Sequence, residues 1–349
     1  MSALVVVDGD VLGRHRTGDE SYVENLVREL GGLERSFDVG VMVRRADAAP
    51  DGVRALELPA RSQVARMTVG IPRLLKYVEP SLVHFLYVAP PFYRGVPVVL
   101  TVHDLSFASD RDLMDPFDRA VFRTFVPRSI RRAARVLVGS RWTLERLAER
   151  YRIPPEKTVV TPYGVDPIFI PDGPRADHGS YLLFVGALQP RKDPLCAVRA
   201  LALLDPELKL AFVGPEKRGG SDVRREVARL GLEQRVRFLG HVPKEELAAL
   251  YRGAACLVLP SRDEGFGLPV LEAMAVGTPV VASTAGALPE VAGEAAVLVP
   301  PRDPAALADG VERALADRDR LRALGLERSR HFTWQETARR TAAVYEELL

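Results

Sequence analysis

Short apolar runs, each followed by a polar segment, recur along the whole chain and constrain its fold more than any other feature. The first run, residues 3–7, is rich in valine and contains no polar side chain, which is typical of a strand buried on both faces of a parallel sheet. Further runs predicted to be strands are residues 38–43, 82–85, 96–102, 136–138, 158–161, 181–185, 210–214, 236–239, 256–260 and 278–282. Helical patterns lie between several of them, so the sequence predicts an α/β protein with doubly wound sheets.

The length of the chain favours two domains of roughly 170 residues each, because 349 residues exceed the usual size of one domain. The best linker candidate lies at residues 159–174, where Pro171, Gly173 and Pro174 interrupt regular structure. We therefore expect an N-terminal domain at residues 1–172, a C-terminal domain at residues 173–332 and a final helix at residues 333–349.

Composition argues against several classes of protein. Acidic and basic side chains nearly balance, and the net charge of +2 gives no reason to expect a nucleic-acid partner. The cysteines, Cys196 and Cys256, lie in apolar segments, which indicates buried thiols in a reducing compartment rather than disulfides or a zinc cluster. The N-terminus lacks the features of a signal peptide, and no apolar run reaches the ~18 residues that cross a bilayer. We therefore expect a cytoplasmic protein.

A glycine-containing turn at residues 264–268 is the strongest candidate for a ligand site. It follows the predicted strand at residues 256–260 and opens a helix, in which Pro269 occupies a first turn that tolerates proline. Its glycines let the backbone approach a ligand closely, and the amides at the start of the helix favour an anion such as a pyrophosphate. The residues assigned to this nucleotide seat are Gly265, Phe266, Gly267 and Leu268.

Two carboxylates flank the nucleotide seat. Glu264 stands in the turn, and Glu272 is expected in the first helical turn. Because carboxylates repel phosphates, they suit the hydroxyl groups of a sugar and a ribose, from which they accept hydrogen bonds. The alternative is that Glu272 only complements the helix dipole and that Glu264 only solvates a loop.

The two glutamates, with seven residues between them, are followed by AMAVGTPVVA at residues 273–282 and GALPEV at residues 286–291. This pattern resembles the nucleotide-sugar site of the retaining glycosyltransferases of family 4, and thinner similarity extends over nearly the whole chain. The resemblance implies the GT-B fold, in which two Rossmann-like domains face a central cleft that holds the active site. It further implies that residues 1–172 form the acceptor side, that residues 173–332 bind the nucleotide sugar, and that residues 333–349 pack back on the first domain.

Two adjacent cations, Arg191 and Lys192, follow the predicted strand at residues 181–185 and could neutralise a departing diphosphate. By resemblance, Lys192 matches the lysine of the family, whereas Ala187 stands where the family usually has arginine. Arg191 is the candidate to replace that arginine. The alternative is that both cations are solvated side chains at the start of a helix.

Two further glycines are assigned to nucleotide binding. Gly186 directly follows the predicted strand at residues 181–185 and opens the loop that carries the two cations. Gly214 begins a loop that, by the same resemblance, borders the nucleotide. The carboxyl ends of buried strands are where open α/β sheets bind ligands, and both glycines are expected there.

In the first half, His103 and Asp104 follow the predicted strand at residues 96–102, again at a carboxyl end. His103 could hydrogen-bond the transferred sugar, and the resemblance supports that role; a structural histidine is the alternative. Gly18 lies in a polar loop that the resemblance places near the acceptor and the phosphates. The family usually has asparagine where Tyr163 stands, so any role of that amide does not carry over.

Two segments of the first half, residues 61–76 and 117–135, mix basic and apolar side chains. Such faces could lie on an anionic membrane surface or hold a lipid-phosphate acceptor, which would make the protein peripheral at the inner face of a membrane. The alternative is a pair of ordinary helices that pack their apolar stripes inward and expose their charges to solvent.

The resemblance implies an enzyme that transfers a hexosyl unit from a nucleoside-diphosphate sugar to an acceptor hydroxyl with retention of configuration. In this reading Glu264 and His103 contact the donor sugar, Glu272 the ribose, and Arg191 and Lys192 the leaving diphosphate. No cofactor and no metal is expected, since the cations already neutralise the diphosphate. GDP-mannose is the leading donor and UDP-hexoses follow, while the acceptor is a glycan, a lipid-linked sugar or a small molecule. The alternatives are a sugar-nucleotide epimerase and a non-catalytic sugar-nucleotide-binding protein.

Overall fold

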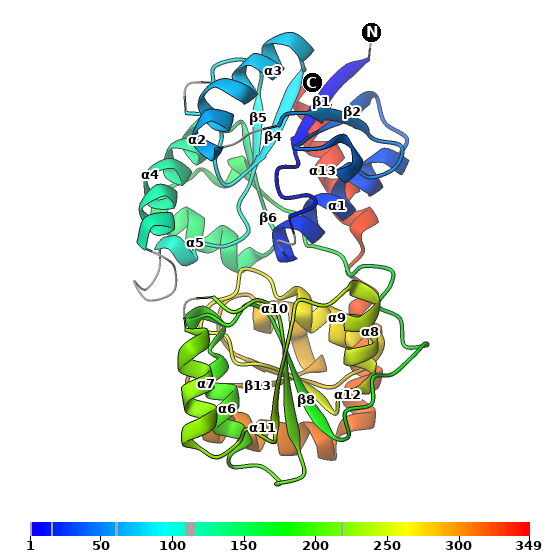
Figure 1. Cartoon of the computed structure of the whole chain (residues 1–349). Coiled ribbons are helices and arrows are strands. Elements are labelled where there is room, and N and C mark those ends of the chain that lie inside the picture. The colour runs from blue at the N-terminus through cyan, green and yellow to red at the C-terminus, as the bar shows by residue number, and fades with distance from the viewer. Residues whose placement is uncertain (1, 15–16, 60–61, 92, 109–115, 218) are drawn as a thin grey trace. The chain divides into compact units, whose positions relative to one another are not determined.

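The computed structural model describes the chain except residues 1, 15–16, 60–61, 92, 109–115 and 218 (Figure 1). Its described residues fall into two compact units. Unit 1 comprises residues up to Ala108, residues 116–164 and Thr333–Leu349, and unit 2 comprises Val165–Phe332. The boundary therefore follows Gly164 rather than residue 172, and residues 165–172 belong to unit 2. The final helix belongs to unit 1.

The strands of unit 1 form one seven-stranded parallel sheet in the order β3-β2-β1-β4-β5-β6-β7. Its strands are β1 (Ala3–Asp8), β2 (Phe37–Val43), β3 (Arg54–Glu57), β4 (Leu82–Leu86), β5 (Val98–Thr101), β6 (Arg135–Val138) and β7 (Thr158–Val160). The predicted runs correspond to six of these strands. Strand β3 was not predicted, because this edge strand is short and only Leu56 in it is buried.

The helices of unit 1 include α1 (Thr17–Gly32), α2 (Gln63–Ala65), η2 (Arg66–Gly70), α3 (Ile71–Val78), α4 (Pro116–Arg132), α5 (Arg141–Tyr151) and α13 (Trp334–Leu348). Helix α13 begins where Thr333 accepts a hydrogen bond from the amide of Glu336, a capping arrangement that fixes a helix start. It lies beside α1 (Figure 1). Its buried Tyr345 places its hydroxyl 2.6 Å from Nδ1 of His84 on β4, which ties the end of the chain to the sheet.

The strands of unit 2 form a six-stranded parallel sheet in the order β10-β9-β8-β11-β12-β13. Its strands are β8 (Tyr181–Val185), β9 (Lys209–Val213), β10 (Val236–Gly240), β11 (Cys256–Leu259), β12 (Val280–Ser283) and β13 (Val297–Val299). The edge strand β13 was not predicted; only Val299 in it is buried. Each unit is thus a Rossmann-like doubly wound sheet, which confirms the predicted fold class.

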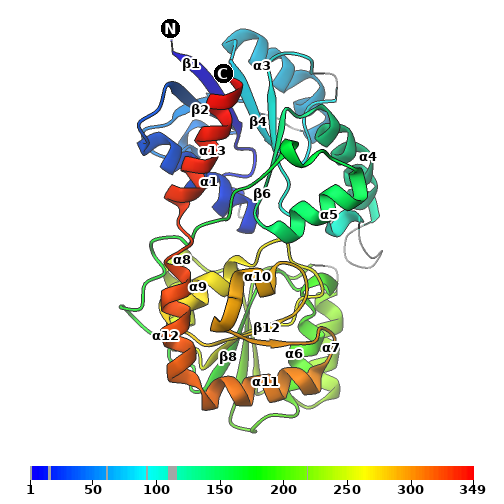
Figure 2. The same ribbon diagram turned by 180° about the vertical axis from the view of Figure 1, so that it is seen from behind.

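Helices cover both faces of the second sheet (Figure 2). They are α6 (Pro194–Leu201), α7 (Gly220–Arg229), α8 (Lys244–Gly253), α9 (Leu268–Val276), α10 (Leu288–Ala292), α11 (Pro304–Ala316) and α12 (Arg318–Ser329). Glu290 lies in α10. Cys196 and Cys256 are both buried in the core, as predicted. None of the described helices is both long and apolar enough to cross a bilayer.

The strand order of each sheet reverses once. In unit 1 the chain fills one side of β1 with β2 and β3 and then continues on the other side with β4, so the reversal lies between β1 and β4. In unit 2 the corresponding reversal lies between β8 and β11. At such switch points the loops at the carboxyl ends diverge and leave a crevice, which is where open α/β sheets bind ligands.

Candidate active site

The strand order of unit 2 brings the two predicted cations against the first predicted carboxylate. Arg191 and Lys192 lie in the short helix η6 (Pro190–Lys192) after β8, and Glu264 lies in the loop after β11. Lys192 Nζ forms an ion pair with Oε1 of Glu264, and Arg191 Nη1 lies 3.2 Å from Oε2. Arg191 also donates a hydrogen bond of 2.8 Å to the carbonyl oxygen of Asp263. Lys192 is buried, so it is not a solvated cation, and the switch point of the sheet holds two positive charges beside one carboxylate.

Glu264 is held ionised by its surroundings. Its side chain is buried and also accepts a hydrogen bond of 2.8 Å from the hydroxyl of Ser261. Burial alone would raise the pKa of this carboxyl, but the charges of Lys192 and Arg191 and the hydrogen bonds outweigh it and lower the pKa to about 2. At neutral pH Glu264 is therefore a hydrogen-bond acceptor only, as recognition of hydroxyl groups requires.

Two glycines make close approaches at the carboxyl ends of β8 and β9. A Cβ on Gly214 would lie 2.3 Å from the carbonyl oxygen of Gly186, and Gly214 has φ +134°, a conformation that only glycine adopts readily. Gly186 lies against the aliphatic chain of Lys192, since its Cβ would be 3.3 Å from Cε. These two predicted residues therefore shape the backbone beside the cations.

Helix α9 begins directly after the glycine-containing turn. Gly267 caps it with φ +109°, and Pro269 occupies the first turn, as predicted. The first amides of a helix have no acceptor within the helix, and here they lie at the carboxyl end of β11. The ring of Phe266 is buried and packs edge-on against Phe332 at 6.0 Å between centroids, so Phe266 can serve a ligand only through its backbone.

Glu272 lies one turn further along α9 than predicted, because the helix begins at Leu268. It therefore does not cap the helix dipole. Its Oε2 accepts a hydrogen bond of 2.7 Å from the hydroxyl of Tyr251 on α8. Burial is the largest influence on this carboxyl and raises its pKa to about 7, with a further rise from the charge of Asp166 and partial opposition from Tyr251 and Lys244. Glu272 is thus poised between its neutral and ionised forms at physiological pH.

A cavity of about 360 Å³ opens at the carboxyl ends of β9 and β10. Gly214 is one of its lining residues, so the cavity adjoins the loop that was predicted to border the nucleotide. The guanidinium of Arg224 lies 4.1 Å from the centre of the Phe238 ring and forms an ion pair with Glu216. The wall therefore combines an aromatic face with a fixed planar cation.

His103 lies in unit 1 within a cluster of aromatic rings. Its Nδ1 is 2.6 Å from the hydroxyl of Tyr163, and its Nε2 is 3.7 Å from a carboxylate oxygen of Asp19. The rings of Tyr22 and Tyr163 lie 4.8 and 5.4 Å from the imidazole. Burial lowers the pKa of His103, so the imidazole is neutral at pH 7, and burial raises the pKa of the Tyr163 phenol well above its ordinary value. The Tyr163 hydroxyl therefore fixes the orientation of a neutral imidazole.

Gly18, expected in a loop, is the second residue of α1. It is exposed, and a Cβ placed on it would meet no atom within 4 Å. Among the residues that the structure describes, no close approach therefore requires glycine at this position.

Comparison with known proteins places these features in a family. A model of Glycosyltransferase Family 4 matches residues 16–169, and a model of Glycosyl transferases group 1 matches residues 167–330. A D-inositol 3-phosphate glycosyltransferase of Geodermatophilus obscurus is 32% identical over 346 residues, which span 88% of this chain and 75% of that protein. The chain belongs to glycosyltransferase family 4.

Other family 4 relatives and solved structures agree. O-antigen chain mannosyltransferase B of Escherichia coli is 30% identical over 296 residues, which span 79% of this chain and 77% of that protein. The structure of a sucrose-phosphate synthase from Thermosynechococcus elongatus superposes with a TM-score of 0.81 at 25% identity and covers 99% of both chains. The chain is thus a family 4 glycosyltransferase of GT-B fold that acts on sugar-nucleotide donors.

Several residues of the candidate site in unit 2 were not predicted from the sequence. Ser261 could have been found, because it lies within the same loop as Glu264. Tyr251 could not, since it reaches Glu272 from another helix and no local pattern marks it. Arg262 pairs with the buried Asp193 through two hydrogen bonds of 2.8 and 3.0 Å, which joins the Glu264 loop to the end of η6. Among the described residues no group of three His, Cys, Asp or Glu side chains is placed to hold a metal ion.

Proposed function

We propose that this protein transfers a hexosyl unit from a nucleoside-diphosphate sugar to an acceptor hydroxyl with retention of anomeric configuration. The observation that carries the proposal is the contact of Arg191 and Lys192 with Glu264 at the switch point of unit 2, beside the start of α9. Two cations and a helix N-terminus suit a diphosphate, and an ionised carboxylate beside them suits the hydroxyl groups of the attached sugar.

In the proposed complex Lys192 and Arg191 bind the diphosphate and Glu264 accepts hydrogen bonds from the donor sugar. Glu264 also holds Lys192 in place before the donor arrives, so the positive charge is already positioned when negative charge develops on the leaving group. Since Arg191 already reaches Asp263 and Glu264, it is the residue that substitutes for the arginine replaced by Ala187.

The nucleoside is proposed to occupy the region between Gly214 and Glu272. The cavity at the ends of β9 and β10 offers a planar base the guanidinium plane of Arg224, which lies over the ring of Phe238. Glu272 in its ionised form accepts hydrogen bonds from the ribose hydroxyls. The proposed donor is GDP-mannose ahead of UDP-hexoses, and the name of the E. coli mannosyltransferase supports a mannosyl group without naming the base.

The proposed chemistry is front-face displacement. The bond from the anomeric carbon to the diphosphate breaks, the bond to the acceptor oxygen forms on the same face, and the acceptor proton passes to a diphosphate oxygen. Glu264, with a pKa of about 2, is too weak a base to take that proton at neutral pH, which leaves the phosphate as the better acceptor. His103 is proposed to contact the donor sugar as a neutral imidazole. Arg191 and Lys192 neutralise the charge of the diphosphate in this proposal, so no metal is required and activity should survive chelators.

A peripheral contact with an anionic membrane is proposed for the segment from α2 to α3. Val64, Val69 and Tyr77 are 73%, 44% and 87% exposed there, and the exposed cations Arg73 and Lys76 accompany them. Arg66, by contrast, is buried and does not contribute to such a face. Flotation with vesicles of phosphatidylglycerol and phosphatidylcholine tests this contact, and equal flotation of the Arg73→Gln/Lys76→Gln variant would exclude it.

Thermal shift against nucleoside diphosphates and their sugars tests the donor first, because a ligand at a hundred times its dissociation constant adds about 2.7 kcal/mol of stability. Incubating the protein with the best donor and candidate acceptors then tests transfer, and NMR of the product anomer tests retention. Donor consumption with an inverted product, or no consumption with any acceptor, would contradict the proposal. A donor that is isomerised without acceptor would indicate an epimerase instead.

A further inference from the structure

An ion pair in unit 2 connects the segment after β8 to the loop after β11. Asp193 directly follows Lys192 at the end of η6, and Arg262 lies two residues before Glu264. Arg262 donates from Nε and Nη2 to the two carboxylate oxygens of Asp193, at 2.8 and 3.0 Å. Its backbone amide donates a further hydrogen bond of 2.7 Å to the carbonyl oxygen of Arg191. These hydrogen bonds join the segment that carries both cations to the loop that carries Glu264.

The backbone of Asp193 has an unusual conformation. Its φ of +50° lies in the left-handed region, which residues other than glycine adopt at a cost. Among the described non-glycine residues with positive φ, Asp193 is the one that is buried; the others are Glu79, Tyr87, Arg152 and Arg302. Glycine would adopt this conformation with less strain, so an aspartate here points to a role for its carboxylate.

The loop that carries Glu264 is also held by the segment after β12. The amide of Ala287 donates a hydrogen bond of 2.8 Å to the carbonyl oxygen of Glu264. Gly286 packs so closely on this backbone that a Cβ on it would lie 2.2 Å from the same oxygen. The loop therefore provides a fixed point to which Arg262 can hold η6.

The ion pair also determines which carboxylate Lys192 contacts. The side chain of Asp193 is 3% exposed and lies one residue from Lys192. Arg262 covers both of its oxygens, and Lys192 pairs with Glu264 instead. Without Arg262, the buried carboxylate of Asp193 would lose this partner and would compete for the nearby cations.

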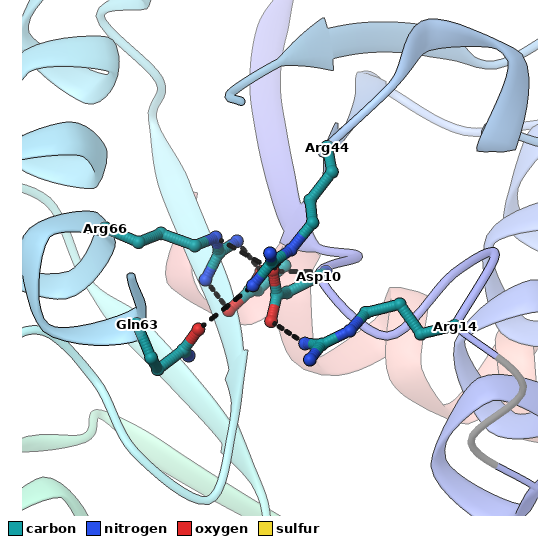
Figure 3. A network of polar contacts seen from close by, with 6 residues as sticks. Asp10, Arg14, Arg44, Gln63 and Arg66 are labelled. Carbon is teal, nitrogen blue, oxygen red and sulfur yellow. Dashed lines mark hydrogen bonds and ion pairs between the residues drawn. The ribbon is translucent and has the colours of Figure 1, made fainter. Parts of the chain in front are cut away.

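A similar contact lies in unit 1, among residues that are not assigned to the donor (Figure 3). The buried Asp10 accepts a hydrogen bond of 2.7 Å from Nε of Arg44, and Arg14 and Arg66 also contact Asp10. The side chains of Arg44 and Arg262 are 29% and 26% exposed, so the two arginines are closely matched. Arg44→Gln is therefore the control for removing an arginine from a buried carboxylate.

We propose that Arg262 and Asp193 are positioning residues for the diphosphate site. By holding η6 to the Glu264 loop, they keep Lys192 and Arg191 where the diphosphate binds before the donor arrives. Side chains that are already in place lose less conformational freedom on binding, and they stabilise the charge of a leaving group without rearrangement. The identity of the ligand rests on the proposed function; the position of Lys192 is measurable without a ligand.

Titration calorimetry with UDP, GDP and the corresponding nucleosides tests the proposal on the whole protein. Arg262→Gln and Asp193→Gly should bind the preferred diphosphate at least about tenfold more weakly and the nucleoside as the wild type does. Glycine suits the left-handed backbone, so Asp193→Gly removes the carboxylate without adding strain. Arg262→Lys should restore part of the affinity, and Arg44→Gln should bind both ligands as the wild type does.

The ratio of the two affinities separates positioning from a structural role. A pair that only stabilises the fold would lower stability alone, or both affinities equally, and either result would overturn the proposal. Melting curves identify any variant that does not fold. If Asp193→Gly does not fold, Arg262→Gln decides, because its substituted side chain is partly exposed.

A double-mutant cycle tests the position of Lys192 without a ligand. Urea unfolding compares Lys192→Met, Arg262→Gln and the double variant. If Arg262 holds Lys192 against Glu264, Lys192→Met should lower the free energy of unfolding less in the Arg262→Gln background than in the wild type. Losses that are additive, or larger in that background, would overturn the proposal. A wild type that binds no diphosphate more tightly than its nucleoside would instead count against the proposed function.

Discussion

The hydroxyl of Tyr251 lies 2.7 Å from Oε2 of Glu272, and this hydrogen bond joins helix α8 to helix α9 beside the proposed nucleotide. The phenol donates and the carboxyl accepts, so the bond favours the ionised glutamate. Burial favours the neutral carboxyl and has the larger effect, so the pKa of Glu272 is raised to about 7.

Nucleoside-diphosphate binding should therefore depend on pH through Glu272. Below pH 7 the carboxyl is protonated and must lose its proton before it accepts from both ribose hydroxyls, so affinity should rise with pH and level off above about pH 7. Titration calorimetry between pH 5.5 and pH 8.5 measures this with the nucleoside, which has no phosphate group that titrates in this range. Glu272→Gln should bind more weakly and without that slope. If the variant keeps the slope, Glu272 does not contact the ribose.

The ion pair of Glu264 with Lys192 should contribute stability that acid removes. The pKa of Glu264 is about 2 in the folded chain against an ordinary 4.5, so the contribution is complete above pH 4.5 and is lost as the pH falls toward 2. Lys192→Met should destabilise by about 3 kcal/mol at pH 7, because it removes one partner of a buried pair. Urea unfolding of this variant, Glu264→Gln and the double variant measures the coupling, and additive effects would show that the pair contributes nothing.

Tyr163→Phe should disturb His103 without disturbing the fold. The substitution keeps the ring, which stacks on Trp334 with 6.0 Å between centroids, but removes the hydroxyl 2.6 Å from Nδ1 of His103. We expect the ¹⁵N shifts of the His103 ring to change and transfer activity to fall by about tenfold, the effect of one lost hydrogen bond to an oriented group.

The control for this prediction is Tyr181→Phe, which removes another buried hydroxyl, 2.6 Å from the carbonyl oxygen of Leu250 in unit 2. Tyr181→Phe should lower the free energy of unfolding by about as much as Tyr163→Phe does, and should leave the His103 shifts unchanged. Unchanged shifts in Tyr163→Phe as well would show that Tyr163 does not orient His103.

The assigned glycines should differ in their tolerance of alanine. Gly214→Ala should be strongly destabilising and should reduce nucleotide binding, because its Cβ would lie 2.3 Å from the carbonyl oxygen of Gly186. Gly231→Ala controls for backbone strain alone, since Gly231 has φ +67° and open space around it, and should cost only about 1 kcal/mol. Gly18→Ala should be tolerated in both stability and binding. If Gly18→Ala lost nucleotide binding but kept its stability, Gly18 would be assigned to the phosphate site.

The sequence predicted most of the strands, because buried parallel strands are continuous apolar runs. It missed the edge strands β3 and β13, in each of which a single residue is buried. Within the site, the turn after β11 was predictable from Gly267 and Pro269. The helical turn that carries Glu272 was not predicted correctly, because it depends on the residue at which α9 begins.

The contact of Lys192 with Glu264 depends on the order of strands in the sheet rather than on a local sequence pattern. It exists because β8 and β11 are neighbours in the sheet although β9 and β10 separate them in the chain. No local sequence pattern indicates that strand order; the family resemblance implied it. The hydrogen bonds from Tyr251 to Glu272 and from Tyr163 to His103 also join distant parts of the chain, and no resemblance pointed to either.

In the proposed function a diphosphate binds at the start of α9 against Lys192 and Arg191. Titration calorimetry with UDP, GDP and the corresponding nucleosides, on the wild type, Lys192→Gln and Arg191→Gln, tests it most directly. We expect at least one diphosphate to bind the wild type far more tightly than its nucleoside does. Lys192→Gln should bind that diphosphate at least about tenfold more weakly, while its affinity for the nucleoside is unchanged. Equal affinities for diphosphate and nucleoside, or a folded Lys192→Gln variant that binds the diphosphate as the wild type does, would contradict it.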